Sequence, residues 1–135
     1  MSDSGTLLLD THVALWWLLA APELPPATQR AISAAPSVHV SAVTTWEVAI
    51  KRAIGRLTLV LPDAVSFPEA CRGHGFTLTD VTHADAEAVA ALPPARRDPF
   101  DRLLAATARR RGWTLVTRDP AIVALGVATL WCEGA

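Results

Sequence analysis

The stretch Thr6-Leu7-Leu8-Leu9-Asp10 is a short apolar run that ends at an acid. Its residues do not alternate between polar and apolar, as they would in a strand with one face exposed to solvent. A continuous apolar run predicts a strand that is buried on both faces. Four later runs have the same character and predict four further strands, at residues 38–41, 76–79, 114–117 and 128–131.

Six stretches of helical character lie between these strands, at residues 13–20, 26–35, 42–54, 62–74, 84–92 and 99–111. Strands that are separated by helices need crossover connections, which place them parallel in one sheet covered on both faces. We therefore expect an α/β fold with three layers, α/β/α, around a central, mostly parallel sheet of about five strands. Because the chain has 135 residues, 51% of them hydrophobic, we expect residues 1–135 to form a single domain.

The helix expected at residues 42–54 has apolar residues at helical spacing. They predict one buried stripe, made of Trp46, Ala49, Ile50 and Ala53. Glu47 then lies at the edge of this stripe, four residues before Lys51, which is the spacing of a solvated ion pair. Gly55 is expected to end the helix in a left-handed conformation.

The last expected helix has signals at both ends. Asp98 is a natural cap, and Pro99 occupies the first turn without losing a hydrogen bond. Arg109 to Arg111 stand near the C-terminus, where cations are favourable, and RNA contact is the alternative role for them. Upstream, Thr82 and Asp85 have the spacing of a capping box, which gives Asp85 a structural role.

The formal net charge of -1 by itself favours neither a nucleic-acid binder nor an enzyme for acidic substrates. Five of the thirteen acids are candidates for a single site, because they stand at the ends of predicted elements. Without these five, the chain has eight acids and twelve Lys and Arg residues, which is an excess of four positive charges. A basic shell around an acidic pocket suits a polyanionic substrate that meets cations in the pocket.

No Lys or Arg precedes the apolar run at residues 13–21, so the basic region of a secretory signal is missing. That run is also shorter than the roughly 20 residues that a membrane helix needs. We expect a cytoplasmic protein without a membrane span. Cys71 and Cys132 lie in no zinc-binding or Cys-x-x-Cys spacing, and we expect both to be reduced thiols.

Five acids stand where a predicted strand or helix meets a loop: Asp10, Glu47, Asp98, Asp101 and Asp119. Each has a structural explanation, since Asp10, Asp98 and Asp119 can cap helices or turns and Asp101 can face a helix N-terminus. These explanations do not account for so many acids on one rim of the sheet. In open α/β sheets, that rim is where ligands bind.

Carboxylates that are brought close together repel one another, and some would protonate unless a cation neutralised them. Mg²⁺ or Mn²⁺ resolves this conflict, because hard cations prefer carboxylate oxygens. Such a site suits phosphodiester hydrolysis, since a bound metal lowers the pKa of an attacking water and stabilises charge on the phosphate. Ser41 and Thr117 are candidates to orient ligands or water, although strand-end hydroxyls more often bond nearby backbone.

Four blocks of sequence, in this order, are more specific than any one of them. They are Leu7-Leu8-Leu9-Asp10-Thr11-His12 with Leu15-Trp16, Ser41-Ala42 through Trp46-Glu47-Val48-Ala49-Ile50-Lys51 to Gly55-Arg56-Leu57, Asp98-Pro99-Phe100-Asp101-Arg102-Leu103-Leu104 with Ala106-Thr107-Ala108, and Leu115-Val116-Thr117-Arg118-Asp119. Together they resemble PIN-domain toxins of the VapC type. The resemblance spans nearly the whole chain and implies a three-layer α/β/α fold.

The resemblance also implies a Mg²⁺-dependent endoribonuclease that is the toxin of a toxin–antitoxin pair. Its substrate would be RNA, its partner a cognate antitoxin protein, and it would form a homodimer. Because Trp16 and Trp17 point about 100° apart on a helix, they cannot both face one core stripe, and one of them is a candidate for a dimer or antitoxin surface.

By motif position, Asp10, Glu47, Asp101 and Asp119 correspond to the family's acidic quartet. Asp98 belongs to the motif of one branch of the family but is not one of the four. We expect Asp10 and Asp101 to bind the principal metal, and Glu47 and Asp119 to complete the shell or position the attacking water. Phosphate contact is expected from one of two arginines, Arg102 or Arg118.

Alternative functions remain open at this point. A strand-end Asp also occurs in aspartyl-phosphate phosphatases, but His12 stands where a second acid is common in those enzymes. A non-catalytic RNA- or protein-binding PIN-like module, whose acids only cap helices, is the other alternative. A nucleotide-binding Rossmann module is disfavoured, because no Gly-rich loop follows the first strand.

Overall fold

The computed structural model describes residues 5–62, 65–94 and 98–133. Its centre is a sheet of five strands in the order β3-β2-β1-β4-β5, with every neighbouring pair parallel. The strands are β1 Thr6–Leu9, β2 Ser37–Ser41, β3 Thr77–Thr79, β4 Thr114–Val116 and β5 Thr129–Leu130. The five predicted strands are confirmed, with ends that differ by no more than one residue.

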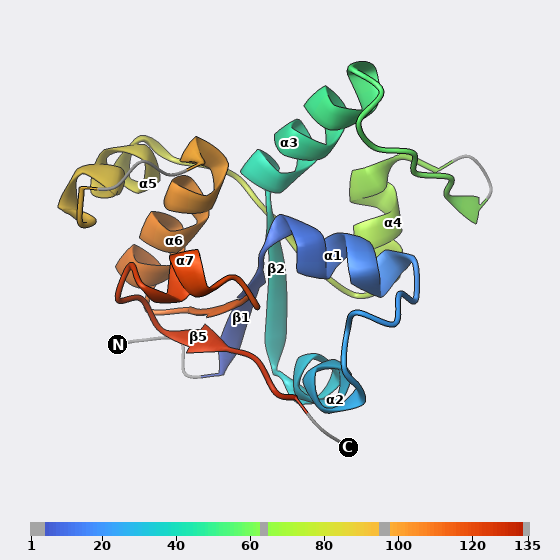
Figure 1. The fold of residues 1–135 in the computed structure, drawn as a ribbon, viewed down its shortest axis with the longest axis horizontal. Helices are drawn as coiled ribbons and strands as arrows, with labels where there is room; N and C mark the ends of the chain where they lie inside the picture. The colour runs from blue at the N-terminus through green and yellow to red at the C-terminus, as the bar shows by residue number, and fades with distance from the viewer. Residues whose placement is uncertain (1–4, 63–64, 95–97, 134–135) are drawn as a thin grey trace.

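Helices cover both faces of this sheet (Figure 1). One face carries α5 His83–Glu87, α6 Pro99–Arg111 and α7 Pro120–Val123, and the other carries α1 Thr11–Leu18, α2 Pro26–Ala34 and α4 Phe67–Gly73. The helix α3 Ala42–Ala53 follows β2, and the 3-10 helix η2 Ala88–Ala91 follows α5. The predicted three-layer α/β/α architecture is therefore confirmed. No helix within the described ranges is both long and apolar enough to cross a bilayer.

Three predicted helices differ from the structure by two residues or more. The helix predicted at 13–20 runs from Thr11 to Leu18, because Asp10 caps it. The helix predicted at 62–74 begins at Phe67, because Ser66 and Glu69 form a capping box that starts it there. Residues 63 and 64 of that prediction lie outside the described residues. The helix predicted at 84–92 changes after Glu87 from an α-helix to a 3-10 turn. The short helix α7 was expected only as a turn or cap at Asp119.

The central strand β1 connects two hydrophobic cores, and this explains its continuous apolar run. Leu7 and Leu9 belong to one core, together with Val13 of α1, whereas Leu8 belongs to the other, together with Leu104 of α6. Leu8, Leu9 and Leu104 are fully buried. Because side chains alternate across a strand, apolar residues are needed at every position where helices cover both faces.

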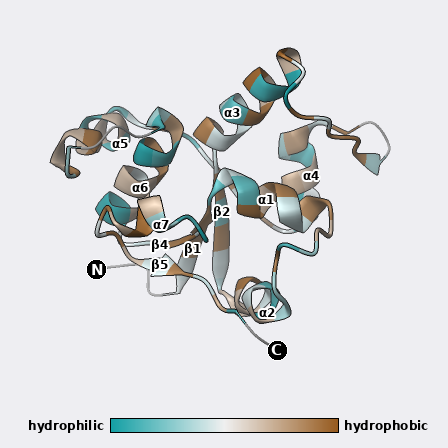
Figure 2. Ribbon diagram, in the orientation of Figure 1, coloured by the Kyte–Doolittle hydropathy of each residue, from teal (hydrophilic) through white to brown (hydrophobic). Residues whose placement is uncertain are grey.

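The predicted buried stripe on α3 is wrong. Trp46 is 59% exposed, and Ala49 and Ala53 are also exposed, while the buried residues are Val43, Thr44, Glu47 and Val48. The helix packs against α1, α6 and β2 through this polar and apolar mixture. Its C-terminal end projects from the body and carries hydrophobic residues, as Figure 2 shows. Gly55 follows it with a φ of 74°, which confirms the predicted left-handed position.

A buried carboxylate joins α5 to the C-terminal end of α6. Asp85 is fully buried, and its side chain accepts hydrogen bonds from the Thr82 amide, from Arg110 and, through both carboxylate oxygens, from Arg111. The predicted capping box between Thr82 and Asp85 is therefore confirmed. Arg110 and Arg111 are engaged with Asp85, which gives these two arginines a structural role.

Candidate active site

The carboxyl ends of β1 and β4 meet where the strand order reverses. From β1 the chain moves outward to β2 and β3, and then returns to place β4 on the other side of β1. Such a reversal leaves a crevice beyond the strand ends, where ligands bind in open α/β sheets. Asp10 follows β1 and Asp119 lies three residues after the end of β4. The Asp10 amide donates to the Val116 carbonyl at 3.1 Å and joins the two strand ends.

Asp10 is buried and is held by hydrogen bonds. The residue is 4% exposed, and its Oδ1 accepts from the Val13 amide at 2.8 Å as the N-cap of α1. Burial raises the pKa of Asp10 and outweighs the hydrogen bonds from Thr117 and Val13, which lower it. The predicted cap is confirmed, and the same carboxylate bears a charge that burial makes unfavourable unless a cation compensates it.

Glu47 lies on the buried face of α3 and is 3% exposed. Its Oε1 accepts from the Thr11 hydroxyl at 2.6 Å, and its Oε2 accepts from the Lys51 ammonium at 2.7 Å. The Thr44 and Thr11 hydroxyl oxygens are 3.2 Å apart. The ion pair expected between Glu47 and Lys51 is present, but the Glu47 carboxylate is buried rather than solvated. Hydroxyls and an ammonium group therefore fix its orientation.

Asp101, in the first turn of α6, is surrounded by the other candidate acids. Burial is the largest cause that raises the pKa of Asp101, to about 7, and the negative charges of Asp98, Glu47, Asp10 and Asp119 add to it in that order. All five acids are therefore close enough to interact electrostatically, although they come from four separate parts of the sequence. The fold gathers them at one end of the sheet.

The acids do not form a preassembled metal cage. Within the described residues, no group of three or more His, Cys, Asp or Glu side chains has the geometry to hold a metal ion. Several carboxylate oxygens are instead turned to helix caps: Asp98 accepts from the Phe100 amide at 2.8 Å, and Asp119 accepts from the Ala121 amide at 2.9 Å. Asp98 is exposed and Asp119 is half-buried.

The two predicted hydroxyl groups differ in their surroundings. Ser41 is buried, and its Oγ accepts from the Val43 amide at 3.1 Å to cap α3. Thr117 is also buried, and its Oγ1 accepts from the Asp119 amide at 3.1 Å. The Thr117 side chain also hydrogen-bonds Asp10. Thr117 is therefore the one of the two that contacts a candidate acid directly.

The two predicted arginines also have different surroundings. Arg102 donates to the Pro93 carbonyl at 3.0 Å and so contacts the connector before α6. Arg118 is exposed, and its guanidinium lies over the Trp16 ring, 4.6 Å from the centroid. Arg118 rather than Arg102 therefore stands beside Asp10 and Asp119.

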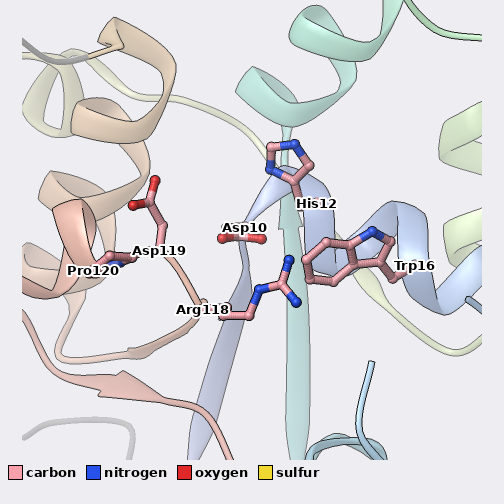
Figure 3. A pocket seen from close by; sticks show the side chains of 6 residues that line it. All are labelled: Asp10, His12, Trp16, Arg118, Asp119 and Pro120. Carbon is pink, nitrogen blue, oxygen red and sulfur yellow. The ribbon is translucent and has the colours of Figure 1, made fainter. Parts of the chain in front are cut away.

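A pocket of about 410 Å³ opens at this place (Figure 3). It is lined by Asp10, His12, Trp16, Arg118, Asp119 and Pro120. It contains two of the candidate acids and one of the two candidate arginines. Figure 3 shows the Arg118 side chain extending toward the Trp16 ring, with Asp10 and Asp119 nearby.

Four further residues contribute to this site, although their positions in the sequence did not predict it. Thr11 and Thr44 support Glu47, and His12 and Trp16 form part of the pocket wall. Thr11 directly follows Asp10, and Thr44 lies one helical turn before Glu47 on the same face. These spacings could have indicated that the two threonines support Glu47. They do so only once α1 and α3 are known to be in contact.

Comparison with known proteins gives a consistent result. Residues 7–127 match the family model of the PIN domain. The chain is 37% identical over 114 residues to Ribonuclease VapC22 of Mycobacterium tuberculosis. These residues are 84% of this chain and 87% of that protein.

Two solved complexes contain chains of similar fold. VapBC2 from Rickettsia felis, bound to a promoter DNA fragment, gives a TM-score of 0.61 at 10% identity and covers 93% of this chain and 97% of that chain. DNA-bound VapBC from Salmonella typhimurium gives a TM-score of 0.63 at 16% identity, and the match covers 94% of this chain and 98% of that chain. The parallel five-stranded sheet, the match over residues 7–127 and the VapC22 relative together show that this chain belongs to the PIN-domain family, in its VapC branch.

Proposed function

We propose that this protein is an endoribonuclease that uses a divalent metal, Mg²⁺ or Mn²⁺, to hydrolyse RNA. The observation that carries the proposal is that five acids from four parts of the sequence meet at one end of the sheet, with Asp10 and Asp119 lining one pocket. The crowding of these charges, together with burial, raises the pKa of Asp101 to about 7. A fold that concentrates negative charge in this way destabilises itself unless a cation is bound. Family membership supports the same reaction, since the VapC22 relative is a ribonuclease.

The donor set fits a hard divalent cation. Mg²⁺ and Mn²⁺ prefer carboxylate oxygens and retain several waters, so they do not require a complete protein cage. Asp10 and Asp101 would bind the principal metal, Glu47 and Asp119 would complete the shell or position water, and Asp98 would stand at its exposed side. When bound, the metal lowers the pKa of a water and stabilises negative charge on the phosphate.

Neighbouring groups of the chain orient these carboxylates. Thr117 and the Val13 amide hold Asp10, while Thr11 and Lys51 hold Glu47. Such supporting hydrogen bonds fix the angle at which a carboxylate meets a metal or a water. Ser41 would act indirectly, because it caps the helix that carries Glu47.

Arg118 is the arginine proposed to contact the scissile phosphate. It lines the same pocket as Asp10 and Asp119, whereas Arg102 is bonded to the Pro93 carbonyl. A guanidinium offers several donors in a fixed plane and is well suited to phosphate oxygens.

We further propose that the protein is the toxin of a toxin–antitoxin pair in the cytoplasm, as a homodimer whose residues 1–135 form one domain. Support comes from the fold shared with VapBC complexes and with a toxin–antitoxin complex from Klebsiella pneumoniae. The match to the PIN domain over residues 7–127 supports the single domain. An antitoxin that covers the pocket could offer a basic side chain to the acids.

The test is cleavage of a structured RNA with Mg²⁺ and with EDTA by the wild-type protein and by Asp10→Asn and Asp101→Asn. We expect cleavage only with Mg²⁺ and a loss of at least about 100-fold in both variants. Asp80→Asn is the matched control, because Asp80 is an exposed acid after β3 and is not among the acids that act on Asp101. Equal cleavage by Asp10→Asn, Asp101→Asn and the control would refute the proposal.

Calorimetry with Mn²⁺ separates the proposal from a module whose acids only cap helices. A cap-only arrangement predicts no measurable binding, whereas the proposed site predicts binding that Asp101→Asn weakens. Trapping of a phosphoryl group on Asp10 would instead support the phosphatase alternative.

A further inference from the structure

Two tryptophans and an arginine form a cluster beside the candidate acids. Trp16 comes from α1 and Trp131 follows β5, and their ring centroids are 6.1 Å apart with an interplanar angle of 59°. The Arg118 guanidinium lies 4.6 Å from the Trp16 ring centroid and 5.9 Å from that of Trp131. Residues far apart in the sequence thus bring two indole rings to one cation.

Two members of this cluster line the same pocket as the acids. Trp16 and Arg118 line it together with Asp10 and Asp119 (Figure 3). His12, an exposed residue on the pocket wall, lies with its ring centroid 5.8 Å from that of Trp16. A nucleotide whose phosphate meets a cation bound at the acids would therefore have aromatic surface directly beside it.

The Arg118 cation is positioned by the rings rather than by a carboxylate. Lys51, Arg110 and Arg111 form ion pairs with acids, whereas Arg118 forms none with a described acid, although it lines a pocket with two of them. Trp131 is oriented in turn by donation from its Nε1 to Glu133 at 2.9 Å. A guanidinium in this setting keeps its donors for a phosphate while its plane extends the aromatic surface.

We propose that Trp16, Arg118 and Trp131 form a binding site for one unpaired RNA nucleotide next to the scissile phosphate. The base stacks against the Trp16 and Arg118 pair, and Arg118 contacts a phosphate oxygen. Indole rings and guanidinium planes both stack on nucleobases, and only unpaired bases can be splayed out to reach them. This inference rests on the proposed function and adds which side chains receive the base beside the cut.

The test measures binding by fluorescence anisotropy in EDTA, so that no cleavage occurs. The probes are a labelled 12-nucleotide single-stranded RNA of mixed sequence, an abasic strand of the same length, and the corresponding 12-base-pair duplex. The variants are Trp16→Leu, Trp16→Phe and Arg118→Ala. Trp17→Leu is the matched control, because Trp17 is also half-buried but contacts His74 and Phe76 and does not line this pocket.

We expect the wild-type protein to prefer the intact single strand to the abasic strand and to the duplex. Trp16→Leu should raise the Kd for the intact strand at least about fivefold and leave the Kd for the abasic strand unchanged. Trp16→Phe should recover most of the affinity, and Trp17→Leu should bind like the wild type. Arg118→Ala should weaken binding to all three probes and reduce the salt dependence by about one charge.

Equal binding of the intact strand by Trp16→Leu and the wild type would overturn the inference, and so would a loss that is the same for intact and abasic strands. If Trp16→Leu does not fold, the exposed Arg118 carries the test, and unchanged binding by Arg118→Ala overturns the inference. Cleavage with Mg²⁺ by the wild type, assayed in parallel, reports on the proposed function separately. Base preference without cleavage would refute that function and leave the nucleotide site supported.

Discussion

The buried Asp85 gives the sharpest prediction about stability. The change Asp85→Asn keeps the size of the side chain but removes the charge and replaces one oxygen by an amide donor. This amide then faces Arg110 or Arg111, which are donors too, inside a site where Asp85 is fully buried. The variant therefore loses charge-assisted hydrogen bonds and gains a donor–donor contact.

The size of the effect follows from the burial of the partners. Breaking a buried ion pair typically costs about 3 to 5 kcal/mol. The side chains of Arg110 and Arg111 are 38% and 20% exposed, so water recovers part of this loss. We expect the free energy of unfolding to fall by about 2 to 3 kcal/mol, which lowers the urea midpoint by about 1 to 2 M.

Urea unfolding followed by tryptophan fluorescence measures this change. The matched control is Glu69→Gln, because Glu69 stands at the same position of a capping box on α4 but is exposed. The control should leave the midpoint essentially unchanged. The reasoning would be refuted if Asp85→Asn and Glu69→Gln had the same midpoint.

The pH dependence of Asp85 has a definite sign. Burial alone would raise the pKa of Asp85, but the hydrogen bonds from Arg111, the Thr82 amide and Arg110 outweigh it and hold the pKa well below its usual range. The folded state thus binds the proton more weakly than the unfolded state. The stabilisation is present above the unfolded pKa and is lost as the pH falls toward the folded pKa.

Three further predictions concern single residues. The pKa of Asp101 is raised to about 7, so the metal-free protein should lose stability as the pH rises from about 4 to 7. Asp101→Asn should remove this loss, as measured by urea unfolding at about pH 8. A urea midpoint of the wild type that does not depend on pH would contradict this prediction. Burial raises the pKa of the Cys71 thiol to about 12. At pH 8, Ellman's reagent should therefore modify only Cys132 in the folded protein, and both thiols in guanidinium. Rapid labelling of Cys71 in the folded protein would be inconsistent with its burial. Leu104→Ala should cost about 3 to 4 kcal/mol of unfolding free energy, because Leu104 is fully buried, and a cost below about 1 kcal/mol would show that the core collapses around the cavity.

The strands were predictable because of where the sheet lies. Helices cover both of its faces, so runs such as residues 6–9 are apolar throughout and stand out in the sequence. The start of α6 was equally predictable, since Asp98 and Pro99 encode it locally. The helix predicted at 62–74 contains two possible starts, Pro62 and Ser66. The helix begins after Ser66, because Ser66 forms a capping box with Glu69.

The orientation of α3 could not be predicted, because it depends on contacts distant in sequence. Apolarity favoured burial of Trp46, yet the buried face carries Glu47. Its partner Thr11 lies 36 residues away. Burial of a carboxylate becomes acceptable only when such donors are supplied, and hydropathy does not contain that information. Trp46 instead lies on the exposed side, with its ring 5.0 Å from that of Phe100.

The candidate acids were found from their positions at element ends, but their surroundings were not. Sequence position made Arg102 and Arg118 equally good candidates for phosphate contact. Only the fold shows that Arg102 contacts Pro93 and that Arg118 contacts Trp16. Likewise, the contact between Arg118 and the Trp16 ring depends on β4 lying next to β1, a pairing between residues more than a hundred positions apart.

The placement of β4 beside β1 has a consequence for protein synthesis. Asp10 emerges from the ribosome early, but the strand that adjoins it and the carboxylate of Asp119 are translated nearly last. An incomplete nascent chain that stops before β4 therefore lacks one wall of the crevice. By this order of assembly, we expect a chain that is released before β4 to lack the assembled site, even though it already carries Asp10, Glu47 and Asp101.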